Sequence, residues 1–388
     1  MPAYIDTIEP FHLIEISGAP YERGLSLGRQ AKSRVLKSIA HYKAQAARWR
    51  LDDETIAAII KNYLPVVERF DPAYLDEMKG IADGADTAFE NIFLLNARTE
   101  IMKLALKPEE RKKLLGAETP DGCTAVTVMP AASKDRSLLH AQNWDWKVEC
   151  HETAVVLRIL RDDGPDILTF TEAGMLARSG FNSAGVAITG NNLESSLDYR
   201  RAGVPLPMIR RKALEAAHLA IAMQTVYATA KTGSSNMAVS HSGGIAINFE
   251  CAPDETFPLH PRDGLLIHAN HWISPVALTK LKDTGIAYSP CTLYRDRRVC
   301  DLLRSHVGQI TTDMVKQALL DDYQSPWSVC RPPRQDFGRD TTSATVATVV
   351  MHPEAGVMEI ANLPAINPTF TSYSISRSCR EYEIAAGM

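Results

Sequence analysis

Hydrophobic positions along the chain follow two different periods, and the period changes near residue 123. Before that point, a short strand is expected at residues 11–16. Between residues 21 and 42, apolar and small side chains fall three or four positions apart with Lys and Arg opposite, which predicts one amphipathic helix. Asp71 and Pro72 are a typical N-cap and first helical residue, so a further helix is predicted to begin there. The first 120 residues are therefore predicted to be mainly helical.

From residue 123 onward the hydrophobic pattern takes the alternating period of β-strands. Short runs rich in Val, Ile, Leu and Thr, separated by Pro, Gly, Asp and Asn, lie at residues 123–129, 137–144, 153–160, 166–170 and 186–189. Helical patterns return at about 208–232 and 293–320 with strands between them, and two last strands flank a turn at 353–356. Strands gathered in batches, with helices between and outside them, predict an α+β protein in which helices cover sheets.

The composition excludes several classes of protein. Of the 388 residues, 45% are hydrophobic and 23% charged, as in ordinary globular proteins. The 42 Lys and Arg are outnumbered by 46 Asp and Glu, so no basic excess is available for phosphates and we expect no nucleic-acid partner. No run approaches the roughly 18 to 20 apolar residues of a membrane helix, so no membrane partner is expected. The seven cysteines form no CxxC pair and no leader is recognisable, which predicts free thiols and a cytoplasmic location.

The junction of the two periods, Gly122 followed by Cys123, suggests a chemistry. Glycine leaves the approach to its carbonyl carbon open, so the thiol of the next residue can attack it. Such an acyl shift, followed by hydrolysis, would free Cys123 as a new N-terminus, so that nucleophile and general base come from one residue. Taken alone the dipeptide is weak evidence, because a cysteine at the start of a strand is more often a small core residue.

Further motifs, in order along the chain, resemble those of one known family. They are GIADGA (80–85), LNARTE (95–100), DGCT (121–124), QNWD (142–145), TEAG (171–174), GFNSAGV (180–186), HANH (268–271) and SVCR (328–331). With these motifs the chain resembles the acyl-coenzyme A:6-aminopenicillanate acyltransferase family, also called isopenicillin N acyltransferase-like, of N-terminal-nucleophile (Ntn) hydrolases.

This resemblance implies a four-layer αββα sandwich with a helical N-terminal segment. It also implies a precursor that cuts itself between Gly122 and Cys123. The products would be an α fragment, residues 1–122, and a β fragment, residues 123–388, which together form one domain. By the matching motifs, Cys123 is the nucleophile, Asp145 assists it and Asn270 supports the oxyanion.

One departure from the family pattern concerns an arginine. Family acyltransferases carry a functional Ser-Arg pair just before an Ala-Thr strand, and here Thr342 stands where the arginine would be. Arg339, three residues earlier, is a candidate substitute if its loop turns inward. The resemblance therefore implies acyl-CoA chemistry less strongly than it implies the nucleophile.

The residue spacing agrees with two of the implied roles. Asp145 follows Cys123 by 22 residues, enough for a strand, a turn and a returning strand, so a hairpin would bring its carboxylate near the new amine. The alternative is a surface or turn aspartate. Asn270 has a side-chain amide able to donate a hydrogen bond to an oxyanion, and the alternative is a turn former at the end of a strand.

Other candidate residues favour structural roles. His268 and His271 lie in a strand-like pattern without a completing carboxylate, so no metal site is predicted. The run at 180–186 resembles a serine nucleophile elbow with one residue too many and is interpreted as a turn. The basic residues Arg210, Arg211 and Lys212 are expected on a solvated helix face rather than on the phosphates of an acyl-CoA.

Together these observations predict a self-processing enzyme that cleaves the amide bond of a small N-acylated compound through a thioester on Cys123, without a cofactor. Acyl transfer from acyl-CoA or an amide to an amine is the first alternative. An uncleaved, non-catalytic binding protein on the same scaffold is the second. The expected partners are the small-molecule substrate and the two fragments of the same chain, and a homo-oligomer stays open.

Overall fold

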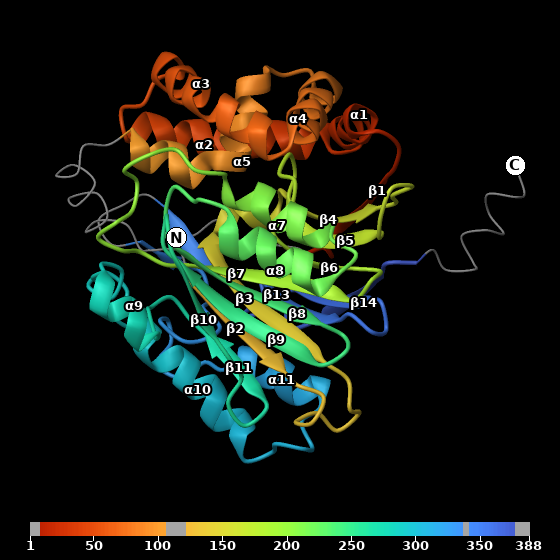
Figure 1. Cartoon of the computed structure of the whole chain (residues 1–388), viewed down its shortest axis with the longest axis vertical. Coiled ribbons are helices and arrows are strands. Elements are labelled where there is room, and N and C mark those ends of the chain that lie inside the picture. Colours follow the sequence, from red (N-terminus) through yellow and green to blue (C-terminus); the bar gives the residue numbers. More distant parts are fainter. Residues whose placement is uncertain (1–7, 106–121, 337–340, 377–388) are drawn as a thin grey trace, which may run out of the picture.

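Two β-sheets packed face to face form the centre of the computed structural model, which describes residues 8–105, 122–336 and 341–376 (Figure 1). One sheet has eight strands in the spatial order β1 (His12–Ile16), β4 (Ala154–Ile159), β5 (Ile167–Glu172), β6 (Ser179–Asn182), β7 (Val186–Asn192), β8 (Ser235–His241), β9 (Ile245–Cys251) and β10 (Thr256–Leu259). The other has seven, in the order β11 (Leu265–His268), β2 (Gly122–Val128), β3 (Leu139–Lys147), β13 (Thr342–His352), β14 (Val357–Asn362) and β15 (Phe370–Ser374), with β12 (Arg334–Gln335) beside β13.

Helices cover the outer face of each sheet. The N-terminal layer contains α1 (Pro20–Gln30), α2 (Lys32–Arg48), α3 (Asp53–Phe70), α4 (Pro72–Ala85) and α5 (Phe89–Leu104). Beneath it, α7 (Leu206–Leu214) and α8 (Leu219–Ala228) pack on the eight-stranded sheet. On the other side, α10 (Thr292–Arg304) and α11 (Thr312–Leu319) pack on the seven-stranded sheet, with α9 (Pro275–Lys280) beside them (Figure 1). The predicted α+β class and αββα sandwich are confirmed.

The predicted single helix over residues 21–42 is wrong, because the structure has two helices that meet at Ala31. The backbone of Ala31 leaves the helical region, with φ −106° and ψ 14°. Leu27 before the bend and Val35 after it are both buried in the same core, so the apolar period continues through the bend and conceals it.

The predicted N-cap at Asp71 is confirmed, since the Asp71 carboxylate accepts a hydrogen bond from the Ala73 N–H at 3.0 Å.

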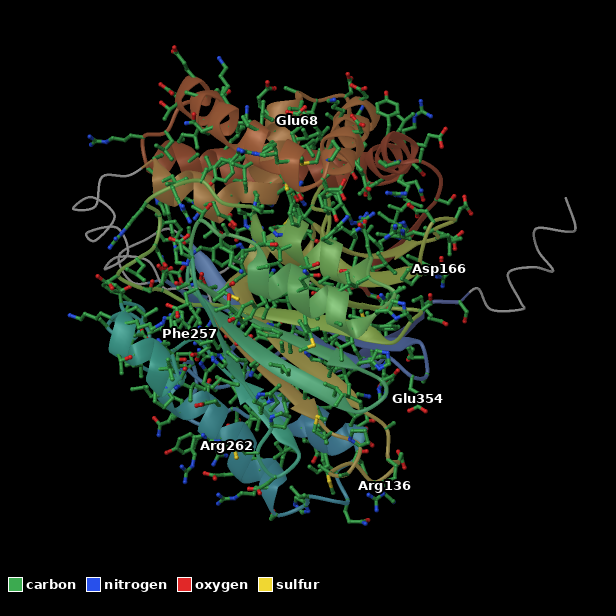
Figure 2. The ribbon with its side chains drawn as sticks, in the orientation of Figure 1. Glu68, Arg136, Asp166, Phe257, Arg262 and Glu354 are labelled. Atoms are coloured by element: carbon green, nitrogen blue, oxygen red, sulfur yellow. The ribbon has the colours of Figure 1, made fainter. Side chains whose placement is uncertain are left out.

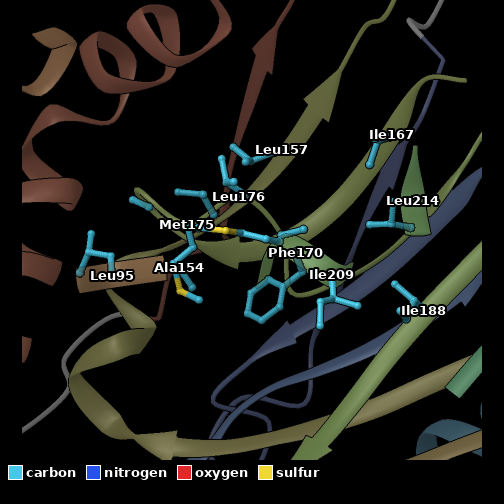
Figure 3. Close-up of a cluster of buried hydrophobic side chains, with 14 of the residues drawn as sticks. Leu95, Ala154, Leu157, Ile167, Phe170, Met175, Leu176, Ile188, Ile209 and Leu214 are labelled. Atoms are coloured by element: carbon cyan, nitrogen blue, oxygen red, sulfur yellow. The ribbon is translucent and has the colours of Figure 1, made fainter. Parts of the chain in front are cut away.

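A continuous apolar core joins the eight-stranded sheet to its helices. Phe170 on β5 and Ile188 on β7 meet Ile209 and Leu214 of α7, and Leu95 of α5 lies at the edge of the same cluster (Figure 3). This packing fixes α5 and α7 against the ends of β5 and β7. Exposed charges occupy the periphery, where Glu68, Arg136 and Glu354 lie on α3 and on two loops (Figure 2).

Polar side chains cross the space between the two sheets near β3. The His140 ring nitrogens lie 2.8 Å from the hydroxyls of Ser240 and Thr189, and Gln142 Nε2 donates to the Gly190 carbonyl at 2.7 Å. Burial lowers the pKa of His140 to about 3. These contacts attach β3, which carries Asp145, to the far sheet.

We predict that His140 makes the protein less stable in mild acid. The folded-state pKa lies below the ordinary value, so the unfolded chain binds a proton near pH 6.5 while the folded protein stays neutral. Its contribution is complete above pH 6.5 and is lost as the pH falls toward 3. The free energy of unfolding should fall by about 2 kcal/mol from pH 7 to pH 5 through this residue.

Urea unfolding of wild type and His140→Gln at both pH values measures this effect. The difference between pH 7 and pH 5 should be smaller in the variant, which cannot titrate, and other titrating groups cancel in the comparison. An equal pH dependence in both proteins would contradict the assignment.

None of the helices within the described ranges has the length and apolar character needed to cross a bilayer.

Candidate active site

Cys123 is the second residue of β2 and is completely buried between the two sheets. Its backbone N–H donates to Asn270 Oδ1 at 2.8 Å, and its carbonyl accepts from Arg295 Nη1 at 2.7 Å. The thiol lies 3.7 Å from Arg178 Nη2. A cation beside a thiol stabilises the thiolate form, which is the nucleophile. Main chain and sulfur of Cys123 are therefore both held by side chains from other elements.

Asp145 lies directly across from the predicted cleavage point. The antiparallel pairing of β2 and β3 places Gly122 opposite Asp145 and Cys123 opposite Trp144, as the hairpin argument expects. Asp145 Oδ2 forms an ion pair with Arg331 Nε at 3.2 Å, and Asp145 Oδ1 accepts from the Thr345 hydroxyl at 2.7 Å. The Asp145 side chain is thus a buried carboxylate in a defined orientation and not a surface aspartate.

Gly122 fits this arrangement because it has no side chain. A Cβ at residue 122 would lie 2.5 Å from Asp145 Oδ2 and 2.6 Å from Arg331 Nη1, so the ion pair occupies the space that any other residue would need. We therefore predict that Gly122→Ala displaces the Asp145–Arg331 pair and slows self-cleavage by roughly 100-fold, the effect of an ångström-scale misplacement. The measurement is the rate at which fragments appear on denaturing gels.

Gly164→Ala is the matched control for this prediction. Gly164 is exposed, and a Cβ there would approach only the Arg161 side chain, at 3.3 Å. The control should be cleaved at the wild-type rate. Wild-type cleavage in Gly122→Ala would show that the position of the ion pair does not matter.

Asn270 faces Cys123 through its carbonyl oxygen. Asn270 Oδ1 accepts from the Cys123 N–H and from Arg295 Nη2 at 2.7 Å, while Nδ2 donates to the Asn192 carbonyl at 2.9 Å. Two donors on one atom fix the orientation of the amide. In this arrangement Asn270 Oδ1 accepts from the Cys123 nitrogen, which would become the new amine. The side-chain N–H of Asn270 donates to Asn192. The role of Asn270 at the oxyanion stays a prediction.

Three buried arginines surround the cysteine, and the sequence reasoning assigned a role to none of them. Arg178, Arg295 and Arg331 come from the segment before β6, from α10 and from the segment before β12. Arg178 stacks on the Trp144 ring at 4.2 Å. Arg331 lies in the SVCR motif, which could have pointed to it. No motif in the sequence marked Arg178 or Arg295. Arg339 lies outside the described residues, and Thr342 begins β13.

Arg331 also contacts a second thiol. Its Nη2 lies 3.2 Å from Cys291 Sγ, and the Ser289 hydroxyl lies 3.3 Å from the same sulfur. Burial raises the pKa of the Cys291 thiol, but the charges of Arg331 and Arg295 outweigh burial and the pKa lies below its ordinary value. The six described cysteines are free thiols as predicted, and Cys379 lies outside the described residues.

The motif block at 95–100, upstream of the cysteine, packs against the block at 171–174, downstream of it. Arg98 Nη2 of α5 pairs with Glu172 Oε1 of β5 at 2.8 Å. Asn96 Oδ1 accepts from the Leu176 N–H at 2.9 Å, and Asn96 Nδ2 donates to the Gly174 carbonyl at 2.8 Å. A cavity of about 50 Å³ lies beside residues 95–100 and is also lined by Met175 and Arg178.

Arg210, Arg211 and His268 are all buried. The solvated face predicted for residues 210–212 is wrong for Arg210 and Arg211, which are buried, because α7 packs between α5 and β7. His268 is buried and its Nε2 lies 2.8 Å from Glu250 Oε1, a contact within the protein. Among the residues that the structure describes, no group of three His, Cys, Asp or Glu side chains is placed to hold a metal.

A family model matches most of the chain. The model of acyl-coenzyme A:6-aminopenicillanic acid acyl-transferase covers residues 131–362. The chain belongs to this family. The acyl-transferase match includes Asp145, Arg178, Asn270 and Arg331 and begins after Cys123. The resemblance found in the sequence is thereby confirmed, and the protein is a member of an enzyme family.

Two known proteins and one solved structure are similar to this chain. The acyl-coenzyme A:6-aminopenicillanic-acid-acyltransferase 40 kDa form of Emericella nidulans is 26% identical over 341 residues, 85% of this chain and 87% of that protein. A beta-alanyl-dopamine/carcinine hydrolase of Drosophila melanogaster is 28% identical over 155 residues, 37% of this chain and 36% of that protein. Among solved structures, a conjugated bile acid hydrolase from Clostridium perfringens is 13% identical with a TM-score of 0.47, over 65% of this chain and 92% of that chain.

Proposed function

We propose that this protein is a self-processing amidohydrolase that uses Cys123, freed as an N-terminus, to cleave a small N-acylated compound. The observation that carries the proposal is that four side chains from different parts of the fold surround one dipeptide, Gly122–Cys123. The Asp145–Arg331 ion pair lies against Gly122, and Asn270 and Arg178 contact the nitrogen and the sulfur of Cys123. Membership of an acyl-transferase family supports acyl chemistry for this protein.

Self-cleavage would begin with attack of the Cys123 sulfur on the Gly122 carbonyl carbon. The peptide C–N bond breaks as the C–S bond forms, and the proton from the thiol ends on the nitrogen, which becomes the α-amino group. Water then hydrolyses the thioester and leaves Gly122 with a carboxylate. Asn270 Oδ1, which already accepts from the Cys123 N–H, would hold the new amine in place.

Turnover would repeat this chemistry on an external amide. The α-amino group takes the thiol proton, the thiolate attacks the amide carbonyl, and the amine leaves with that proton. Water then releases the acyl group from the sulfur. Arg178 would stabilise the thiolate, and Asp145, held by Arg331 and Thr345, would orient the amine.

Acyl transfer to an amine is the second candidate function. The match to the Emericella nidulans acyltransferase over 85% of this chain favours it. Thr342 in place of the family arginine favours hydrolysis instead. The two reactions share the thioester on Cys123 and differ only in what removes the acyl group.

Side-by-side progress curves test the proposal. One series contains an N-acyl amide alone, and the other contains the matching acyl-CoA with an amine acceptor, each with wild type and with Cys123→Ala. We expect amide hydrolysis by wild type only. A kcat/KM for amine acylation from acyl-CoA well above that for hydrolysis would replace the hydrolase by the transferase. Equal turnover by Cys123→Ala would refute both.

A further inference from the structure

Asn270 lies in an irregular turn, residues 269–274, between β11 and α9. Four backbone N–H groups of this turn donate to side chains from other parts of the chain. Residue 270 donates to Thr292 Oγ1 at 2.7 Å, residue 272 to Asp283 Oδ2 at 2.9 Å, and residues 273 and 274 to the Glu250 carboxylate at 2.6 and 3.0 Å. In a helix or a sheet the backbone itself would supply such acceptors. The path of the turn therefore depends on three side chains, and Glu250 accepts two of the four hydrogen bonds.

Glu250 reaches the turn from the other sheet. It lies on β9 of the eight-stranded sheet, whereas β11 belongs to the seven-stranded sheet, and the two strands are in contact (Figure 1). The Glu250 side chain is completely buried. Both of its oxygens are used, because Oε1 accepts from the Ile273 N–H and Oε2 accepts from the Ser274 N–H. The carboxylate thus fixes the last two residues of the turn, which lead into α9.

The same carboxylate also fixes the residue before the turn. His268 Nε2 lies 2.8 Å from Glu250 Oε1, and both side chains are completely buried. His268 ends β11 two positions before Asn270, and Ile273 follows Asn270 by three positions. One carboxylate therefore holds the chain on both sides of Asn270. Hydrogen bonds to an ionised acceptor are roughly twice as strong as neutral ones, so an uncharged side chain would hold the turn less firmly.

The position of the turn sets the distance between Asn270 and the Cys123 nitrogen. Asn270 Oδ1 accepts from the Cys123 N–H at 2.8 Å, and Asn270 Nδ2 donates to the Asn192 carbonyl at 2.9 Å. A contact much longer than roughly 3.5 Å is no longer a hydrogen bond. A shift of the turn by about 1 Å away from Cys123 would therefore break the first of these bonds.

We propose that Glu250 is a positioning residue for the reaction at Cys123, because it holds the turn that places Asn270 against the Cys123 nitrogen. This inference rests on the proposed function, in which that nitrogen becomes the amine that takes the thiol proton. Glu250 supplies no group to the substrate in this scheme and acts through Asn270.

Glu250→Gln is expected to lower kcat roughly 10- to 100-fold, the effect of an ångström-scale misplacement, while the chain stays folded. The introduced amide has the size of the carboxylate but only one oxygen. One of the N–H groups of Ile273 and Ser274 would then face an NH2 group and lose its acceptor. The measurement is kcat with an N-acyl amide, with circular dichroism to verify folding.

Glu77→Gln is the matched control for this substitution. Glu77 is also a buried glutamate whose two oxygens are both used, by Arg23 and Arg211, and it lies on α4 in the N-terminal helical layer. This variant should keep the wild-type kcat. An equal loss of kcat in Glu77→Gln and Glu250→Gln would overturn the inference, because the place of Glu250 in the fold would then not matter.

Asn270→Ala separates positioning from a general effect on the fold. If Glu250 acts through Asn270, adding Glu250→Gln to Asn270→Ala should lower kcat by less than about twofold. A residue that only supports the fold would cost the same factor with and without Asn270, because the effects of independent sites add in free energy. Equal factors in the two backgrounds would overturn the inference.

Hydrogen exchange tests the position of the turn without the reaction. In the Cys123→Ala background residue 123 keeps its backbone N–H, and we expect Glu250→Gln to speed exchange at this N–H at least about tenfold. Exchange at Val156, on β4, should not change. Equal exchange at residue 123 with and without Glu250→Gln would overturn the inference.

The outcomes separate this inference from the proposed function. Wild-type kcat in Glu250→Gln, together with loss of turnover in Cys123→Ala, would overturn the positioning role and leave the hydrolase. Turnover by Cys123→Ala would instead refute the hydrolase, and hydrogen exchange at residue 123 would then decide whether Glu250 holds the turn.

Discussion

Replacing Cys123 by alanine is expected to leave a single uncleaved 42.7 kDa chain that turns over no amide. The thiol is the group proposed to attack both Gly122 and the substrate, so its removal stops both reactions at once. The fold should survive, because Cys123 is a small buried residue and alanine fills most of the same space. Cys123→Ser should cleave slowly, since a hydroxyl is a weaker nucleophile than a thiol at neutral pH.

Two other buried thiols make this prediction specific. Cys330 is buried nearby, and burial raises its pKa to about 12, so it stays a neutral thiol and Cys330→Ala should behave as wild type. Cys291 is the rival nucleophile, since Arg331 and Arg295 lower its pKa. Mass spectrometry and an amide assay on all three alanine variants decide between them. Turnover that survives in Cys123→Ala but not in Cys291→Ala would move the chemistry to Cys291.

Asp145→Asn is expected to reduce turnover by roughly 100- to 10,000-fold while the chain stays folded. The change is nearly isosteric, and the carbonyl of the introduced amide can still accept from Thr345, but the charge that faces Arg331 and would orient the new amine is lost. The measurement is kcat of the folded protein, with circular dichroism to verify folding. Wild-type rates in this variant would reduce Asp145 to a structural role.

Glu77→Gln is the matched control for the loss of a buried charge. Glu77 is 1% exposed and pairs with Arg211 at 3.0 Å, so its chemistry and burial resemble those of Asp145. Glu77 also pairs with Arg23 at 3.1 Å, and Arg211 has a second partner in Glu215. Glu77→Gln should lower thermal stability, because the buried Arg23 loses its carboxylate partner, and should leave kcat unchanged. Equal losses of kcat in both variants would indicate that charge burial in general, and not the position of Asp145, limits the rate.

The sequence could predict the local frame of the site. The change of period at Cys123 marks where β2 begins, and the 22-residue interval to Asp145 suffices for the β2–β3 hairpin that places Asp145 opposite Gly122. Both inferences need only the chain direction and the rise per strand residue. The bend at Ala31 escaped the same reasoning, because the apolar period of two helices packed on one core continues through it.

The charges around the site could not be predicted in the same way. Arg178, Arg295 and Arg331 are 55, 172 and 208 positions from Cys123, and only the packing of both sheets and α10 brings them together. A basic run such as 210–212 is usually solvated, and it is the packing of α7 against α5 that buries Arg210. The burial of Arg210 therefore depends on contacts between elements and not on a motif.

Intact mass together with N-terminal sequencing of the purified wild-type protein tests the central claim most directly. Cleavage between Gly122 and Cys123 predicts two copurifying fragments, about 13 and about 29 kDa in proportion to their lengths, because they would share one core. The larger fragment should begin Cys-Thr-Ala-Val. A single 42.7 kDa species with Met1 as its only N-terminus, in a preparation that hydrolyses amides, would contradict the account.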